Sequence, residues 1–171
     1  ASSPRERPRV YVELWFGKHA RTVGGRTYIH DIVVAADTAV ISLSEVKIGL
    51  VPACISPYVV MRAGPAACRE FFLSGERMSA DKAFRLGLVN AVAPAGELDE
   101  AVAVFTKRLI SSGPEALAVC KDLLDNVYGM PLEEAKGYTA KVIAEVRVSD
   151  EGQEGMAAFL EKRKPNWLEK K

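Results

Sequence analysis

The stretch that decides the fold is residues 31–50, DIVVAADTAVISLSEVKIGL. Its residues 32–43 are mostly small or β-branched, and the run is broken at Asp37 and Thr38. This pattern predicts a buried segment, a turn, and then a short strand over residues 39–43. Glu45 follows at the end of that strand. A residue in this position is held rigidly by the sheet yet faces a crevice, which suits a group that must meet a substrate in fixed geometry.

The elements on either side of this stretch are predicted from the periodicity of the residues and from the positions of proline and capping residues. Residues 10–16, VYVELWF, alternate with period two and predict a strand, whereas no period dominates residues 17–31. Downstream, Pro57 marks a helix start, Pro65 suits the first turn of the next helix, and Ser79 is a candidate N-cap. The predicted helices cover residues 66–73, 80–86, 98–111, 114–128, 131–148 and 152–164, and a short strand is predicted at 88–92.

The order of these elements indicates the fold class. The chain has 171 residues, a length that suits one well-filled domain of roughly 100–200 residues. Strands come early and helices late, which predicts an α/β or α+β layout with a division into residues 1–96 and 97–171. The C-terminal helices are strongly amphipathic, so we expect them to pack on the sheet layer or on a partner subunit.

Composition excludes several classes of function. Apolar residues make up 49% and charged residues 26% of the chain, and a net charge of +1 gives no basic excess for binding nucleic acid. No apolar run approaches the roughly 18 residues of a membrane span, so we expect no membrane partner. Three cysteines, Cys54, Cys68 and Cys120, match no zinc motif and favour a reducing compartment. His19 and His30 have no ligand at metal-binding spacing, so no metal is expected.

Several segments, in this order and spacing, carry a resemblance to a known family. They are residues 31–35 (DIVVA), 44–52 (SEVKIGLVP), 73–80 (LSGERMSA), 87–89 (GLV) and 150–163 (DEGQEGMAAFLEKR). Together they resemble the enoyl-CoA hydratase, or crotonase, superfamily over about residues 31–168. Residues 52–60, PACISPYVV, are similar to the branch that includes methylglutaconyl-CoA hydratase.

The resemblance implies a partial crotonase core, a spiral of ββα turns, followed by a C-terminal helical trimerisation region. It implies assembly as a homo-trimer or hexamer, located in a bacterial cytoplasm or a mitochondrial matrix. The implied chemistry is hydration of a 2-enoyl-CoA thioester through an enolate whose oxygen is held by two backbone N–H groups. Glu45 matches a catalytic glutamate of the family. The acyl-CoA is the substrate, and no separate cofactor is implied.

The chain departs from the family at the other catalytic glutamate, because Glu45 matches the second of the family's pair and the family spacing places the first at Gly25. Gly24 and Gly25 are the nearest matches to the oxyanion donor, although the spacing points to Thr22 and a glycine pair is commonly a simple turn. A single carboxylate also fits an enoyl-CoA isomerase. Because the family has a further N-terminal part, a fragment, a site shared with another chain, and an inactive assembly or CoA-binding subunit are all kept as alternatives.

Phe159 and Lys162 match positions where the family's C-terminal helix meets the adenine and phosphate of coenzyme A. A ring for stacking and a cation for phosphate, three residues apart, are expected on one helix face. Without the resemblance, Phe159 would be read as core packing and Lys162 as part of a solvated run.

Overall fold

The computed structural model describes residues 31–169. The strand predicted at residues 10–16 and the candidate oxyanion residues Gly24 and Gly25 lie outside this range. Contacts divide the chain into two compact units, Ala1–Val104 and Phe105–Lys171. Each unit is described by itself.

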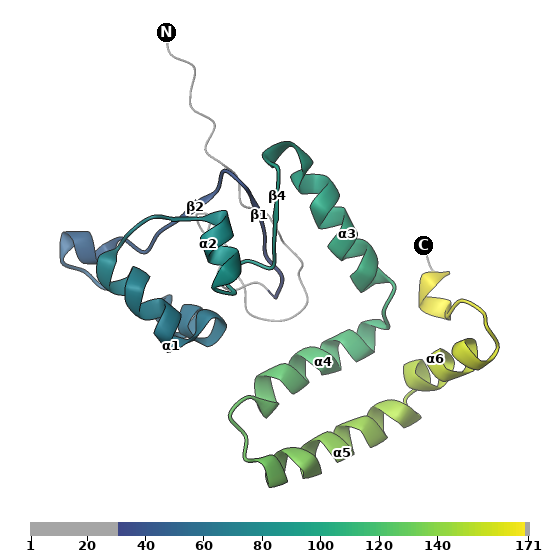
Figure 1. The fold of residues 1–171 in the computed structure, drawn as a ribbon. Helices are drawn as coiled ribbons and strands as arrows, with labels where there is room; N and C mark the ends of the chain where they lie inside the picture. The colour runs from purple at the N-terminus through teal and green to yellow at the C-terminus, as the bar shows by residue number, and fades with distance from the viewer. Residues whose placement is uncertain (1–30, 170–171) are drawn as a thin grey trace. The chain divides into compact units, whose positions relative to one another are not determined.

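Short strands form two small sheets in the first unit (Figure 1). Strand β1, Val34–Ala36, pairs in parallel with β4, Ala91–Ala93, while β2, Val40–Ile41, pairs antiparallel with β3, Met78–Ser79. The predicted turn between β1 and β2 is closed by a 2.9 Å hydrogen bond from the Ala39 N–H to the Ala36 carbonyl. Strand β2 is shorter than the predicted residues 39–43 because its partner β3 has only two residues.

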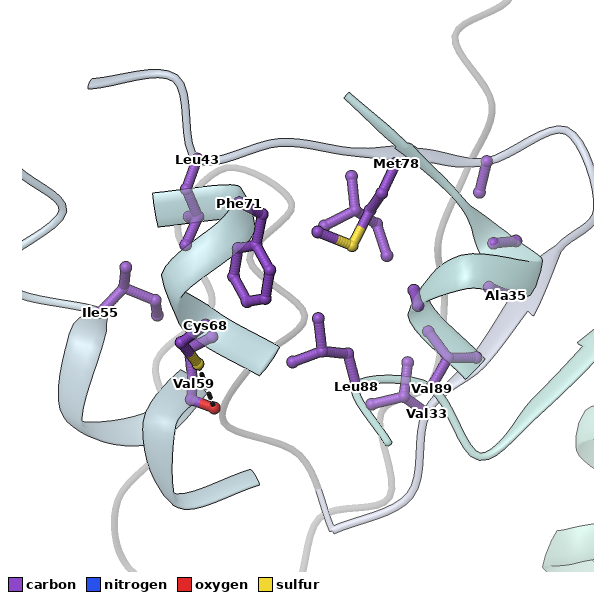
Figure 2. Close-up of a cluster of buried hydrophobic side chains, with 14 residues drawn as sticks. Val33, Ala35, Leu43, Ile55, Val59, Cys68, Phe71, Met78, Leu88 and Val89 are labelled. Carbon is purple, nitrogen blue, oxygen red and sulfur yellow. Dashed lines mark hydrogen bonds between the residues drawn. The ribbon is translucent and has the colours of Figure 1, made fainter. Parts of the chain in front are cut away.

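The core of the first unit lies between these strands and helix α1, Ser56–Ser74 (Figure 2). Its largest fully buried side chains belong to Phe71, Leu88, Val33, Val34 and Val59. Cys68 is also buried, with its Sγ 3.7 Å from the Val59 carbonyl oxygen, and desolvation raises the pKa of its thiol. Val33 and Val34 belong to the segment whose composition predicted burial, and their burial confirms that prediction.

Helix α1 is two helices joined at Gly64, which has the non-helical angles φ 78° and ψ 156°. This break confirms the separate helix starts predicted from Pro57 and Pro65. Helix α2, Ala80–Arg85, confirms the predicted cap, because the Ser79 hydroxyl accepts from the Lys82 N–H at 3.2 Å.

The strand predicted at residues 88–92 begins later than expected. The N–H groups of Leu88 and Val89 donate to the Ala83 carbonyl at 2.9 and 3.3 Å, which closes the end of α2. Strand β4 begins at Ala91, which pairs with Val34 of β1, and the Asn90 N–H just before it donates to the Val33 carbonyl at 2.7 Å. The prediction was therefore right about a strand after α2 and wrong about where it starts.

Helices α4, Pro114–Val127, α5, Leu132–Val148, and α6, Asp150–Leu160, contact one another within the second unit (Figure 1). The chain reaches them through the short helix η2, Ala95–Glu97, and α3, Leu98–Ile110. A final 3-10 turn, η3, covers Asn166–Leu168. Within residues 31–169, no helix is long and apolar enough to cross a bilayer.

Helix α6 differs from the predicted residues 152–164 at both ends. It starts earlier because the Ser149 hydroxyl accepts from the Gly152 N–H at 3.1 Å and caps it. It stops at Leu160, and Lys162 lies in the left-handed region with φ 56°. The expectation that Phe159 and Lys162 share a helix face is therefore wrong.

Candidate functional site

Glu45 is the first residue of a single 3-10 turn, η1, which covers Glu45–Ile48. The turn is closed by hydrogen bonds from the Lys47 N–H to the Ser44 carbonyl at 2.9 Å and from the Leu50 N–H to the Glu45 carbonyl at 3.0 Å. Strand β2 has already ended at Ile41. Glu45 thus lies in this turn, beyond the end of the strand. Its backbone is fixed by the two hydrogen bonds to the Ser44 and Glu45 carbonyl groups.

The Glu45 side chain is half-buried, and its Oε2 atom is fully shielded from solvent. Within residues 31–169, Oε2 has no hydrogen-bond partner. A buried acceptor without a partner costs about 1–3 kcal/mol, so an orphaned carboxylate oxygen in a native fold calls for an explanation. An oxygen that accepts a hydrogen bond only when substrate or water is present is one such explanation.

The turn that carries Glu45 packs against Gly75, the C-cap of α1. A Cβ atom placed on Gly75 would lie 2.9 Å from Val46 Cγ2 and 3.3 Å from two carbons of the Lys47 side chain. Ser42 Oγ lies 3.5 Å from the Gly75 carbonyl oxygen, at the limit of a hydrogen bond. Two segments quoted above, residues 44–52 and 73–80, therefore meet at this glycine.

Phe159 and Lys162 lie in the second unit, at the end of α6. Both are exposed, and 83% of Phe159 is accessible to solvent. The Lys162 N–H donates to the Phe159 carbonyl at 3.3 Å, and the Arg163 N–H donates to the Ala158 carbonyl at 3.0 Å. The two candidate residues belong to one tight turn, although not to one helix face.

An ion pair next to this turn joins Arg163 to Glu154. Arg163 Nη1 and Nη2 donate to the two carboxylate oxygens of Glu154 at 2.6 and 2.9 Å, and Nε donates to Glu161 at 2.6 Å. The Asn166 N–H adds a fourth bond, to Glu154 Oε1 at 2.9 Å. The hydrogen bond from Arg163 is the main reason that the pKa of Glu154 falls to about 2, and Glu154 in turn raises the pKa of Arg163.

Two hollows lie among α4, α5 and α6. One, of about 470 Å³, is lined by apolar residues of α4 and α5, including Val119, Leu123 and Ile143. The other, of about 760 Å³, also reaches α6 and Trp167. Among residues 31–169, no cluster of three or more His, Cys, Asp or Glu side chains could hold a metal ion.

The candidate residues fall in three places. Glu45 lies in the first unit, Phe159 and Lys162 lie in the second, and Gly24 and Gly25 lie outside the described part of the chain. The sequence analysis missed the roles of Glu154 and Arg163, which lie nine residues apart. A charged pair at this distance gives no helical signal, because it meets only when the chain turns back after α6.

Comparison with known families identifies the class of protein. The family model for enoyl-CoA hydratase/isomerase matches residues 25–170. The carnitinyl-CoA dehydratase of Escherichia coli K12 is 36% identical over 145 residues, which cover 80% of this chain and 54% of that protein. The chain thus spans about half the length of this curated relative.

Solved structures agree with the family model. The enoyl-CoA hydratase of Shewanella pealeana superimposes with a TM-score of 0.76 at 42% identity, covering 80% of this chain and 51% of that one. The enoyl-CoA hydratase/isomerase of Marinobacter aquaeolei gives a TM-score of 0.79 at 33% identity, covering 84% and 55%. This chain belongs to the enoyl-CoA hydratase/isomerase family, and its fold is a partial crotonase core with C-terminal helices.

Proposed function

We propose that this chain contributes the acid/base residue of a lyase that adds water to a 2-enoyl-CoA, and that Glu45 is that residue. The observation that carries the proposal is the buried Glu45 Oε2 atom, which has no partner among residues 31–169. Membership of the enoyl-CoA hydratase/isomerase family supports an acyl-CoA thioester as the substrate.

The chemistry needs one proton to be removed and one to be returned. Glu45 takes a proton from water as the water oxygen bonds to the β carbon, and the electron pair of the double bond moves toward the thioester carbonyl to give an enolate. Glu45 then returns the proton to the α carbon. Backbone N–H groups near Gly24 and Gly25 are our candidates for holding the enolate oxygen, where preorganised donors have their largest effect.

A steady-state assay with a short 2-enoyl-CoA tests this proposal. Replacing Glu45 by Gln removes the proton acceptor but keeps the shape, so we expect kcat to fall by roughly 10²- to 10⁴-fold. The exposed Glu76→Gln variant is the matched control and should retain the wild-type rate. A wild-type protein without turnover, or a Glu45→Gln variant with full turnover, would contradict the proposal.

Double-bond isomerisation is the second candidate function, because Gly25 occupies the position expected for the first glutamate of the family's pair. An isomerase would shift a 3-enoyl-CoA to its 2-enoyl isomer without adding water. Supplying a 3-enoyl-CoA separates the two reactions, since an isomerase converts it to the 2-enoyl isomer, whereas a hydratase finds no double bond conjugated with the thioester to which water could add.

The second unit is our candidate for self-association. Several large apolar side chains of α4 and α5 are exposed within it, namely Leu124, Leu132, Ile143 and Val148. Burying such side chains would favour assembly, each by about 1.5–3 kcal/mol when burial is complete. Light scattering after size-exclusion chromatography tests the proposed trimer or hexamer, and a monomer at micromolar concentration would exclude it.

A further inference from the structure

The pairing of β2 with β3 decides which part of the chain lies next to the turn η1. Ile41 of β2 lies opposite Met78 of β3, and Met78 is 3% exposed. Because the pair is antiparallel, the residues after Ile41 run back along the residues before Met78. Ser42 Oγ lies 3.5 Å from the Gly75 carbonyl oxygen, so the two segments stay side by side beyond the strands. The register of this short sheet therefore brings η1 to the end of α1.

Gly75 is fixed at this meeting point from both sides. Its N–H donates to the carbonyl of Phe71 at 3.0 Å, and Phe71 is a core residue that is 2% exposed. Three residues beyond Gly75, Met78 is held in the sheet. Gly75 itself is left-handed, with φ 59° and ψ 23°. Since Gly75 cannot shift without disturbing the core, a side chain that lies against it must adjust instead.

Val46 is the side chain that lies against Gly75. A Cβ atom at position 75 would stand 2.9 Å from Val46 Cγ2, well inside the roughly 3.5–4.0 Å at which carbon atoms pack. The two nearby Lys47 carbons belong to a long side chain that can swing away, whereas a valine is branched at Cβ and restricted at χ1. Room for Val46 therefore depends on the absence of a side chain at position 75.

Val46 and Glu45 are adjacent residues of one rigid turn. Three hydrogen bonds close η1, from the N–H groups of Lys47, Gly49 and Leu50 to the carbonyls of Ser44, Val46 and Glu45, at 2.9, 3.3 and 3.0 Å respectively. A displacement of Val46 is therefore passed on to the backbone of Glu45. Because the Glu45 Oε2 atom is shielded from solvent in this arrangement, moving the turn also changes the surroundings of the carboxylate.

We propose that Gly75 and Val46 are positioning residues for Glu45: position 75 carries no side chain, so that Val46 can seat η1 against the end of α1 and hold the carboxylate in place. The inference rests on the proposed function for the reaction that Glu45 serves. Neither residue takes part in proton transfer. Placement matters to such a reaction, since a shift of about 1 Å can lower a rate by roughly 10²-fold.

A double-variant cycle on kcat tests the inference, at a temperature where every variant is folded. Gly75→Ala should lower kcat by roughly 10²-fold and leave KM for the acyl-CoA unchanged, because ground-state binding is not altered. Adding Val46→Ala makes room for the new methyl group and should restore most of kcat, although Val46→Ala alone should lower kcat several-fold. The isosteric Val46→Thr leaves no room and should restore none. Gly129→Ala, which is strained but has nothing within 4 Å of its Cβ, should keep the wild-type rate.

The double variant separates placement from stability. Its left-handed alanine remains strained, so its unfolding temperature should stay below that of the wild type while kcat returns. A Gly75→Ala variant with the wild-type kcat, or a double variant no faster than Gly75→Ala, overturns the inference.

Hydrogen exchange of the Leu50 amide follows the turn without substrate, because this N–H bonds to the Glu45 carbonyl. Exchange should be faster in Gly75→Ala and slow again in the double variant, and unchanged exchange in Gly75→Ala also overturns the inference. If the wild type shows no hydration while exchange behaves as expected, the proposed function alone fails.

Discussion

Gly75 lies so close to Val46 that a Cβ atom on the glycine would stand 2.9 Å from Val46 Cγ2. The contact joins the end of α1 to the turn that begins with Glu45. Any side chain at position 75 would therefore push on Val46 and, through Val46, act on the candidate catalytic residue Glu45.

We expect Gly75→Ala to lower both stability and activity. The left-handed φ of 59° costs an alanine about 1–2 kcal/mol, and the new methyl group must also displace Val46, which costs about 1 kcal/mol or more. Gly129→Ala is the matched control, since its φ is 78° and nothing lies within 4 Å of its Cβ. Urea unfolding should show a larger loss for Gly75→Ala, and equal losses would contradict the packing argument.

A second prediction concerns Gly113 and Glu151. The Glu151 carboxylate accepts from the N–H groups of Glu115 and Ala116 at 3.0 and 2.8 Å and so caps the start of α4. A Cβ on Gly113 would lie 2.3 Å from Glu151 Oε1 and would push the carboxylate away. Gly113→Ala and Glu151→Ala should each cost about 1 kcal/mol, the usual contribution of a cap.

Gly137→Ala gives the contrasting result, because Gly137 lies inside α5 with open space around its Cβ. This change should stabilise the chain by about 0.5–1 kcal/mol. Thermal unfolding of the three variants should show a loss of stability for Gly113→Ala and Glu151→Ala and a gain for Gly137→Ala. A stabilised Gly113→Ala variant would show that Glu151 does not cap α4.

The third prediction concerns Asn90, whose Oδ1 atom accepts from the Val33 N–H at 2.8 Å and from Arg62. Val33 is 1% exposed, so Asn90→Ala removes the acceptor for a buried N–H and should cost about 1–3 kcal/mol. Asn90→Asp keeps an acceptor oxygen and should be much less damaging. Hydrogen exchange of the Val33 amide reports the bond directly, and slow exchange in Asn90→Ala would refute its importance.

The fourth prediction is a pH dependence. The pKa of Glu154 falls from 4.5 to about 2 in the folded chain, chiefly through its hydrogen bond with Arg163. A depressed folded-state pKa means that the pair stabilises the fold above pH 4.5, and that this stabilisation is lost as the pH falls from 4.5 through about 2. The difference in unfolding temperature between wild type and Glu154→Gln should shrink over this window. A difference that stays constant would contradict the assignment.

Local features of the sequence determined much of the fold. Ser79 predicted the start of α2 and Pro65 the second half of α1, because capping and the fixed φ of proline act within one helical turn. The composition of residues 32–36 predicted a buried segment, and Val33 and Val34 are almost fully buried. The order of the quoted segments was enough to indicate the family that the comparisons then established.

Tertiary structure decided the rest. The close approach of Gly75 to Val46 and the Glu151 carboxylate that caps α4 both join residues distant in sequence, so the periodicity of the sequence does not reveal them. Lys162 shows the same limit at short range. Helical spacing extended α6 through it, but the ion pair of Arg163 with Glu154 and the bonds of the turn fix a left-handed residue where sequence preference would put glycine.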